Sequence, residues 1–331
     1  MAAPSPTVTL RPQRIRASSS QLEKQRQQAN AELPDALGAP WLAEDTAPIP
    51  ADAAFVDDIK GLFPTTHGVP HCTLGSGVAV AEAGGGLRVG VVLSGGQAPG
   101  GHNVVAGLYD AVKKTGPESA FYGFLDGPHG IFTGNVTRID DAMMDSYRNT
   151  GGFDMIGSGR HKIETPEQFQ DSQSVCQQLN LDGLVVIGGD DSNTNAALLA
   201  EYFASTGCKT KVIGCPKTID GDLKCPPSIP VSFGFDTACR TYSELVGNIA
   251  LDALSAQKYY HFCRLMGRSA SNIALEVALL TNPNVCLLGE EVQAKDLSLK
   301  ELTSQLVSLI QSRAAEGKNY GVVVLPEGLI E

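Results

Sequence analysis

The sequence predicts an α/β protein in which helices cover both faces of a parallel β-sheet. Short runs such as "LRVGVVLSGG" (87–96) and "LDGLVVIGG" (181–189) consist mainly of apolar residues and glycine without polar alternation, which is typical of strands buried on both faces. Between them lie segments with apolar residues at helical spacing, such as "NVVAGLYDAV" (103–112). Each glycine-rich run stands at the carboxyl end of a predicted strand. Ligands bind at these ends in parallel sheets, so the pattern also predicts where the site lies.

Two groups of alternating elements follow one another along the chain. In the first group we predict strands at 87–96, 119–127, 181–189 and 210–217 and helices at 103–112, 165–179 and 194–204. A long helix then leads into the second group. The predicted elements there are helices at 237–256, from Ser271 and at 297–315, with strands at 261–267, 284–291 and 320–328. Because a parallel sheet rarely stops so soon after a strand, we expect the natural protein to continue beyond Glu331.

The 331 residues are enough for two domains of ordinary size. The N-terminal part reads poorly as a core, so we expect an extension that wraps the domain, with a short helix near 20–29. Prolines and alanines in "APIPADAA" (47–54) and a linker at "EAGGG" (82–86) are typical of such an extension. The predicted divisions are 1–86, 87–236 and 237–331.

Charge and cysteine usage limit the classes of function. The formal net charge of -11 argues against a nucleic-acid partner, although local Arg and Lys can still bind an anionic substrate. No apolar run reaches the ~18 residues that a membrane span needs. Eight cysteines without a CxxC pair predict reduced thiols in a cytoplasmic protein. A transit peptide is the alternative, because Arg11, Arg14 and Arg16 precede the first acid, Glu23.

Two adjacent carboxylates follow the strand in "VVIGGDDSNTN" (185–195). Asp190 and Asp191 stand at a turn of the type that usually receives phosphate. A divalent cation explains the pair, because Mg²⁺ prefers carboxylate and phosphate oxygens with water completing its octahedron. Asp190 is the candidate Mg²⁺ ligand, and Asp191 adds bulk and charge where a nucleoside would need space. The alternative is that one carboxylate is a helix N-cap.

A second glycine-rich loop, "LSGGQAPGGHN" (93–103), joins a strand to a helix. Glycines let backbone amides approach an anion, and the helix N-terminus adds partial positive charge. Gly96 and Gly101 have the spacing of a Walker A loop, but His102 and Asn103 replace its Lys and Ser/Thr. The loop therefore suits a phosphate ligand without being a nucleotide-triphosphate motif, and an ordinary tight turn is the alternative.

The third strand end, "CPKTIDGD" (215–222), combines acids with a lysine. Asp220 and Asp222 flank Gly221, and Lys217 lies nearby in the sequence. This pattern is typical of phosphoryl transfer, in which an Asp accepts the proton of a hydroxyl and a Lys stabilises the transferring group. A surface turn with a Lys–Asp pair is the alternative.

Three further side chains are candidates for ligand binding. Arg160 in "GSGRHK" (157–162) and Arg268 are suited to bidentate phosphate contacts, although either fits an ordinary surface position. Glu327, at another strand end, is suited to sugar hydroxyls, or else it is a helix-start acid. The six histidines have no metal-ligand spacing.

Four of these segments together resemble the phosphofructokinases: "GGDDSNTN", "PKTIDGD", "KYYHFCRLMGRSAS" and "PEGLIE". They look most like the long, pyrophosphate-dependent type found in plants and protists, and the similarity runs from about Ser20 to Glu331. The resemblance implies a phosphofructokinase-like α/β fold with two Rossmann-like three-layer domains, parallel-rich sheets and an active site in the cleft between them. It also implies reversible phosphoryl transfer from pyrophosphate to the 1-hydroxyl of fructose 6-phosphate, with Mg²⁺.

The resemblance gives roles to the donor-site residues. ATP-using members of the family carry glycine where this chain has Asp191 and Lys217. The resemblance therefore implies that Asp191 fills the space that a nucleotide would need and that Lys217 contacts pyrophosphate. Gly96 would also touch pyrophosphate, and Asp190 would bind Mg²⁺.

The catalytic and sugar-binding roles are also implied by the resemblance. Asp220 would be the base for the sugar hydroxyl, supported by Thr218 and Asp222, while Lys217 and Arg160 would stabilise the transferred phosphoryl group. The residues expected to bind fructose 6-phosphate are Thr218, Asp220, Met266, Gly267, Arg268 and Glu327. Lys258 and Tyr259 match residues that the family lends to the neighbouring subunit's sugar site.

A shared sugar site implies a homo-oligomer, at least a dimer, or a hetero-oligomer with a regulatory subunit. Regulatory subunits of the plant type have degraded "TIDGD" and "GGDD" motifs. Both motifs are intact here, so the sequence resembles the catalytic kind. An ATP-dependent phosphofructokinase and a non-catalytic regulatory subunit are the alternatives.

Overall fold

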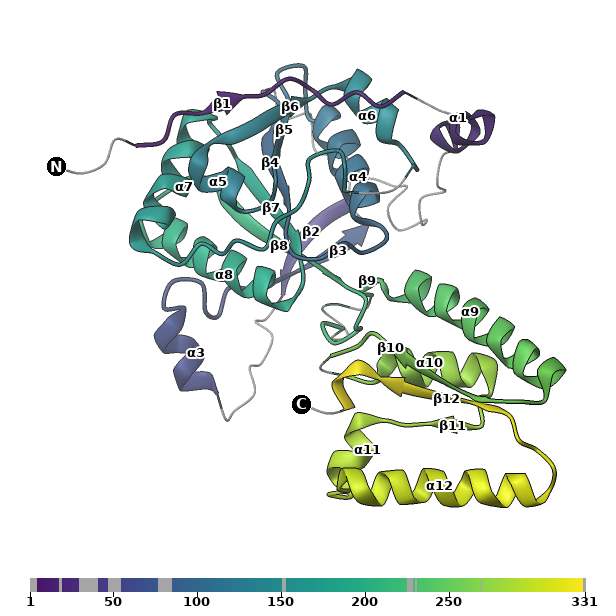
Figure 1. Cartoon of the computed structure of the whole chain (residues 1–331). Helices are drawn as coiled ribbons and strands as arrows, with labels where there is room; N and C mark the ends of the chain where they lie inside the picture. The colour runs from purple at the N-terminus through teal and green to yellow at the C-terminus, as the bar shows by residue number, and fades with distance from the viewer. Residues whose placement is uncertain are drawn as a thin grey trace. The chain divides into compact units, whose positions relative to one another are not determined.

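The chain forms two compact units, Met1–Pro216 (unit 1) and Lys217–Glu331 (unit 2) (Figure 1). The structure, a computed structural model, describes residues 5–17, 20–29, 41–46, 55–76, 85–150, 153–224, 229, 231–268 and 270–329. The functional division of the chain at residues 86 and 236 stays a prediction.

Unit 1 is built on a mostly parallel sheet with the strand order β1-β6-β5-β4-β7-β8. The strands are β1 (Thr9–Leu10), β4 (Arg88–Leu93), β5 (Ala120–Phe124), β6 (Asn135–Ile139), β7 (Gly183–Gly188) and β8 (Lys211–Thr218). β4, β5, β7 and β8 confirm the four strands predicted in this part of the sequence. β6 was not predicted, and it pairs antiparallel with β5, so the sheet is not parallel throughout.

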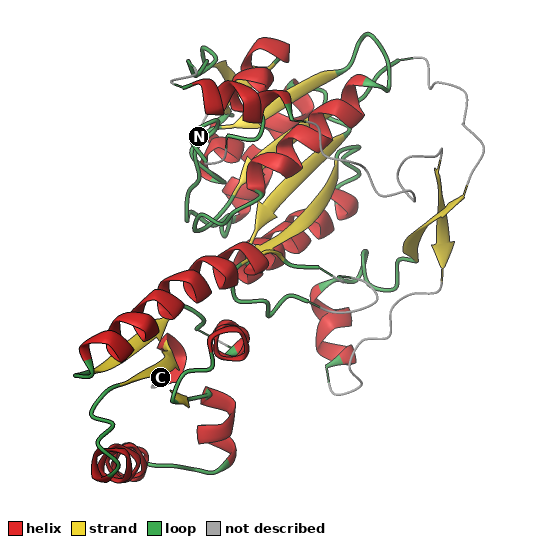
Figure 2. Ribbon diagram, turned by 90° about the vertical axis from the view of Figure 1, so that its right-hand side faces the viewer, coloured by secondary structure: helices red, strands yellow, loops and turns green. Residues whose placement is uncertain are grey.

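Helices lie on both faces of this sheet, as the sequence predicts for a parallel sheet (Figures 1 and 2). They are α4 (Gly101–Lys113), α5 (His129–Thr133), α6 (Asp141–Tyr147), α7 (Pro166–Gln178) and α8 (Asp190–Ser205). α7 starts where it does because Thr165 and Gln168 form a capping box and Pro166 occupies the first turn. α8 begins four residues earlier than the predicted start at 194, so its first turn includes both adjacent aspartates.

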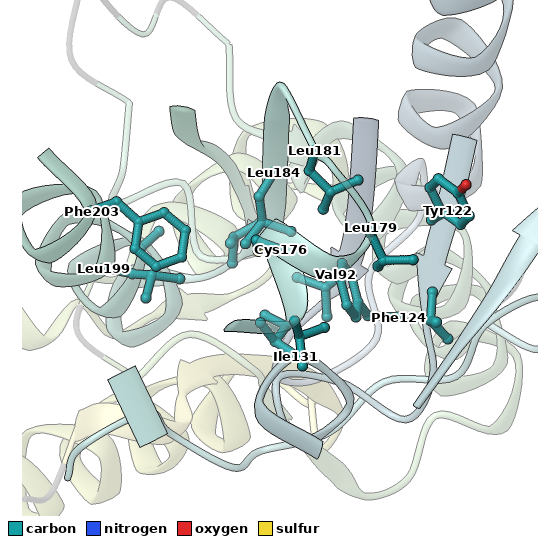
Figure 3. Close-up of a cluster of buried hydrophobic side chains, with 14 of the residues drawn as sticks. Val92, Tyr122, Phe124, Ile131, Cys176, Leu179, Leu181, Leu184, Leu199 and Phe203 are labelled. Carbon is teal, nitrogen blue, oxygen red and sulfur yellow. The ribbon is translucent and has the colours of Figure 1, made fainter. Parts of the chain in front are cut away.

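The main hydrophobic core of unit 1 packs strand side chains against α5, α7 and α8 (Figure 3). Val92 and Leu184 come from neighbouring strands, Cys176 from α7 and Phe203 from α8, and each is at most 1% exposed. Complete burial of a side chain such as leucine or phenylalanine contributes about 1.5–3 kcal/mol. This packing holds the strand ends, and therefore the loops that follow them, in fixed positions.

Unit 2 has a three-stranded parallel sheet with the order β10-β12-β11. Its strands are β10 (Tyr260–Leu265), β11 (Val285–Cys286) and β12 (Gly321–Pro326), and its helices are α9 (Phe235–Ala256), α10 (Asn272–Thr281), α11 (Gly289–Ala294) and α12 (Leu299–Ala315). A short strand, β9 (Phe233–Gly234), pairs with the last two residues of β8, and a 3₁₀ turn, η1 (Glu327–Leu329), follows β12. The prediction of a strand at 284–291 is wrong beyond Cys286, because the good helix formers after Gly289 form α11.

The N-terminal region contains more structure than predicted. The helix expected near 20–29 is confirmed as α1 (Gln21–Gln28), with Ser20 as its N-cap. β1 extends the edge of the unit 1 sheet beside β6, β2 (Trp41–Thr46) pairs with β3 (His71–Ser76), and α3 (Val56–Leu62) lies between those two strands in the sequence. "APIPADAA" (47–54) and most of "EAGGG" (82–86) lie outside the described residues.

One carboxylate ties the segment after α3 to α8. Glu201, which is 9% exposed, accepts hydrogen bonds from the backbone N–H groups of Thr65 and Thr66, both at 2.8 Å, and from the Thr66 hydroxyl at 2.7 Å. Burial alone raises the pKa of Glu201, but these hydrogen bonds outweigh it and lower the pKa to about 2.

We expect Glu201→Gln to loosen this attachment, because the amide offers one acceptor oxygen in place of two. Limited proteolysis within residues 63–70 should become several-fold faster, whereas Glu118→Gln, a substitution of an exposed acid in the same unit, should have no effect. Because the folded pKa lies below the unfolded value, the attachment is complete above about pH 4.5 and is lost as the pH falls towards 2. Unchanged proteolysis of Glu201→Gln would show that the carboxylate does not hold the segment.

Candidate functional site

The strand order of unit 1 reverses between β4 and β7. The chain passes from β4 to β5 on one side and later returns to β7 on the other, which creates a topological switch point. Crevices at such points, beyond the carboxyl ends of the strands, are the usual ligand sites of open α/β sheets. β4 and β7 run in register up to Leu93 and Ile187, so the loops that follow them start side by side.

Hydrogen bonds join three loops at this switch point. The N–H of Ser94 donates to the carbonyl of Ile187 at 2.8 Å, and the N–H of Gly95 donates to the carbonyl of Gly159 at 2.9 Å. The Ser158 hydroxyl is 2.7 Å from the carbonyl of Gly95 and donates to it. The hydroxyl groups of Ser94 and Ser192 are 2.8 Å apart, which links the glycine-rich loop to the start of α8. The glycine-rich loop, the "GSGRHK" loop and the start of α8 therefore form one connected surface.

Gly96 and Arg160 meet on this surface. A Cβ added to Gly96 would lie 3.5 Å from Nη2 of Arg160, so the bare backbone is next to the guanidinium group. Both residues are exposed. An accessible backbone beside a planar cation is suited to the oxygens of a phosphate group.

Asp190 and Asp191 occupy the first turn of α8, where the helix dipole stabilises negative charge. The N-cap residue is Gly189, so neither aspartate is the N-cap that the alternative interpretation requires. Both are exposed, and Asp191 Oδ1 lies 3.2 Å from Nζ of Lys162. One carboxylate of the pair thus has a cationic partner from the "GSGRHK" loop.

His102 in the first turn of α4 does not add positive charge to the glycine-rich loop. Burial lowers the pKa of its imidazole below the usual value, so the ring is neutral at pH 7. α4 itself begins at Gly101, after Gly100 with φ of +102°, a conformation that favours glycine.

In unit 2, the loop after β8 is held by hydrogen bonds to its backbone. The Thr218 side chain accepts from the N–H of Asp220 at 3.0 Å, and the carbonyl of Asp220 accepts from the Asn272 amide at 3.1 Å. Gly221 has φ of +74°, and a Cβ there would approach Phe235 at 3.2 Å. Lys217, the residue before the last of β8, is only 4% exposed. The loop therefore presents the Asp220 side chain from a well-defined backbone.

The loops after β10 and β12 lie against each other, because Leu265 pairs with Pro326 at the ends of these strands. The N–H of Gly267 donates to Oε1 of Glu327 at 3.4 Å. A Cβ added to Gly328 would lie 1.9 Å from the carbonyl oxygen of Arg268, so only glycine allows this approach. The structure thus brings together the predicted sugar-binding residues Met266, Gly267, Arg268 and Glu327.

A cavity of about 450 Å³ opens beside these two loops. Its lining includes Gly267, Arg268, Ser271, Gly289, Glu290 and Gly328. Glu290 accepts from the N–H of Ser271 at 2.8 Å, and the Ser271 hydroxyl accepts from the N–H of Gly289 at 2.9 Å. Burial raises the pKa of Glu290, but the hydrogen bonds outweigh it, so the net shift is downward and the carboxylate is ionised at pH 7. Neither Ser271 nor Glu290 was predicted from the sequence as a site residue.

Lys258 and Tyr259 are not part of this group. They precede β10, whereas Met266 to Arg268 follow it, and the six residues of the strand span about 20 Å. Tyr259 is 71% exposed. Within one chain, these two side chains therefore lie at the opposite end of β10 from the sugar-binding loops.

The candidate metal ligands in unit 1 fit a Mg²⁺ ion that is bound partly by the protein and partly by substrate phosphates. Within the described ranges, no three His, Cys, Asp or Glu side chains are grouped closely enough to hold a metal ion by themselves. Asp190 offers one exposed carboxylate next to a phosphate-type loop, and Mg²⁺ is commonly held by one or two carboxylates together with substrate phosphates. Among the described helices, none has the length and hydrophobicity that crossing a membrane requires.

The strand order and the residues at the strand ends define the class of protein. It is an α/β protein with carboxylates, cations and glycine-rich loops at the carboxyl ends of its parallel strands, where ligands bind. The model of the family described as "Phosphofructokinase" matches residues 88–331. The chain therefore belongs to the phosphofructokinase family.

Relatives and a solved structure agree with this assignment. The chain is 52% identical over 322 residues to the Solanum tuberosum pyrophosphate–fructose 6-phosphate 1-phosphotransferase subunit beta, covering 96% of this chain and 56% of the relative. It is 55% identical over 283 residues to the Treponema pallidum pyrophosphate–fructose 6-phosphate 1-phosphotransferase, covering 83% and 49%. The chain thus spans about half the length of the curated relatives it matches. The pyrophosphate-dependent phosphofructokinase of Nitrosospira multiformis has the same fold, with a TM-score of 0.62 at 21% identity over 73% of this chain and 60% of that one.

Proposed function

We propose that the protein transfers a phosphoryl group reversibly from pyrophosphate to the 1-hydroxyl of fructose 6-phosphate, giving fructose 1,6-bisphosphate and phosphate. Family membership and the names of the relatives support this reaction. The observation that carries the choice of donor is Asp191 in the first turn of α8, beside Asp190. The family resemblance implies that the carboxylate of Asp191 fills space that a nucleotide donor would need.

Unit 1 supplies the groups for the donor. The exposed backbone at Gly96 and the guanidinium of Arg160 bind oxygens of pyrophosphate, and Asp190 holds Mg²⁺. When bound, Mg²⁺ neutralises charge on the phosphate oxygens. Arg160 also stabilises negative charge on the transferred group, and Asp191 excludes the larger nucleotide donor.

Unit 2 supplies the groups for the acceptor. Asp220 accepts the proton of the sugar hydroxyl, and the hydrogen bonds to its backbone keep its carboxylate in place. Thr218 and Asp222 support this position, and Lys217 contacts pyrophosphate and stabilises the transferring phosphoryl group. Met266, Gly267, Arg268 and Glu327 bind the sugar phosphate.

The position of Lys258 and Tyr259 supports an oligomer, at least a dimer. They lie at the opposite end of β10 from the sugar-binding loops, so they are suited to the site of a neighbouring subunit. The Solanum tuberosum relative is named as a subunit. This name supports the alternative assembly, a hetero-oligomer with a regulatory subunit. We propose the cytoplasm as its location, because the cysteines whose side chains the structure describes are free thiols: Cys176, Cys208, Cys215, Cys239, Cys263 and Cys286.

The proposed function is tested by measuring fructose 1,6-bisphosphate formed from fructose 6-phosphate and Mg²⁺ with each donor. We expect turnover with pyrophosphate and none with ATP. Removal of Mg²⁺ by a chelator should abolish turnover. Turnover with ATP alone would contradict the role of Asp191, and turnover with neither donor would favour a regulatory subunit.

A further inference from the structure

We propose that Lys162 is a positioning residue of the donor site. Its ammonium group neutralises Asp191 and fixes that side chain at the start of α8, so that Asp191 excludes a nucleotide without repelling pyrophosphate. This inference rests on the proposed function and adds a residue that the sequence motifs do not identify.

The charge balance of the first turn of α8 requires such a partner. Asp190 and Asp191 are adjacent, and the proposed donor is itself strongly anionic. The charge of Asp190 is used by Mg²⁺, whereas Asp191 has no metal role and would repel pyrophosphate. Lys162 Nζ is 3.2 Å from Asp191 Oδ1, with side chains 47% and 66% exposed, so the pair removes that charge at the edge of the site.

The backbone around Lys162 is fixed to the same helix. Asn195 lies four residues after Asp191 and therefore on the same face of α8. Its Oδ1 accepts from the N–H of Ile163 at 3.0 Å, and its amide donates to the carbonyl of Ile163 at 2.6 Å. Ile163 is 2% exposed. These bonds hold the backbone next to Lys162 against α8, within reach of Asp191.

The two cations of the loop have different neighbours. Arg160 lies beside Gly96, next to the glycine-rich loop, whereas Lys162 extends to Asp191 on α8. Arg160 is thus available to the ligand, and Lys162 acts through a carboxylate. This division predicts that Lys162 matters for pyrophosphate only while Asp191 is charged.

A double-mutant cycle of Lys162→Gln and Asp191→Asn in the full chain tests this prediction. Lys162→Gln alone should raise KM for pyrophosphate by about two- to fivefold, the range of an exposed ion pair. In the Asp191→Asn background, the same change should alter KM by less than about 1.5-fold. KM for fructose 6-phosphate should stay constant throughout, which a general loss of structure would not allow, and Lys162→Arg should restore the pyrophosphate KM.

The chain offers a matched control. Lys209 and Asp182 form a pair of 2.9 Å with side chains 49% and 37% exposed, at the amino end of β7. Lys209→Gln changes the net charge equally but lies at the other end of the strand. It should leave KM for pyrophosphate unchanged.

The outcomes separate this inference from the proposed function. Suppose that the unmodified chain turns over pyrophosphate and that Lys162→Gln has the same effect in both backgrounds. Lys162 would then contact pyrophosphate directly, which would overturn this inference and leave the proposed function intact. If the unmodified chain shows no turnover, calorimetric binding of pyrophosphate replaces KM in the same cycle. If pyrophosphate binds and the effect of Lys162→Gln on its affinity depends on Asp191, the inference is supported although the proposed function is not. If pyrophosphate does not bind, both are overturned.

Discussion

Asp220→Asn is expected to lower kcat by about 10²- to 10⁴-fold, the usual contribution of a positioned general base. The hydrogen bonds to Thr218 and Asn272 involve the backbone of Asp220, so the substitution retains both of them and removes the ability of the side chain to accept a proton. KM for fructose 6-phosphate should therefore change much less than kcat. The measurement is steady-state kinetics with pyrophosphate as donor.

Asp252→Asn is the control for this substitution. Asp252 is an exposed acid on α9 in the same unit, and its replacement changes the net charge equally. It should leave kcat unchanged. If Asp220→Asn retained the kcat of the unmodified chain, Asp220 would not be the base and the catalytic interpretation of "TIDGD" would fail.

Gly328→Ala is expected to raise KM for fructose 6-phosphate and to lower kcat/KM by roughly 10²-fold, the cost that a misplacement of about 1 Å has for catalysis. The added Cβ would lie 1.9 Å from the carbonyl oxygen of Arg268, so one of the two sugar-binding loops must move. Backbone strain is not the cause, since Gly328 has φ of -81°. Because unit 1 is unaffected, KM for pyrophosphate should change far less.

Gly247→Ala is the matched control, because a Cβ at that position meets nothing within 4 Å. It lies inside α9, where alanine should stabilise the helix by about 0.5–1 kcal/mol. Melting temperatures of both variants show whether the chain remains folded. A folded Gly328→Ala protein with unchanged KM for the sugar would show that the Arg268 loop is not part of the sugar site.

The parallel strands in the middle of the unit 1 sheet, the strands of the unit 2 sheet and most helices were predictable because burial dictates their composition. Apart from Arg88 at the start of β4, the strands β4 and β7 are apolar, since helices cover both faces of the sheet, and the predicted strands at 119–127 and 210–217 correspond to β5 and β8. β6 was missed because its sequence, "NVTRI", mixes polar and apolar residues, and β1 was missed because it has only two residues. β1 at the edge of the sheet and β6 beside it depend on pairing with distant segments rather than on local composition.

The candidate site was predictable where a residue follows a strand. The rule that ligands bind at the carboxyl ends of parallel strands places Gly96, Asp190, Asp220 and Arg268 without a structure. The pairs Lys162–Asp191, Ile163–Asn195 and Ser271–Glu290 were not predictable. Their members are 29, 32 and 19 residues apart and belong to loops and helices whose contacts depend on the fold.

The measurement that tests the central claim most directly is the donor dependence of the unmodified chain beside that of Asp191→Gly. The unmodified chain should form fructose 1,6-bisphosphate with pyrophosphate and not with ATP. Asp191→Gly should gain measurable turnover with ATP, because the glycine leaves space for the nucleotide. Turnover of the unmodified chain with ATP, or an Asp191→Gly variant that still rejects ATP while it retains pyrophosphate turnover, would contradict the role assigned to Asp191.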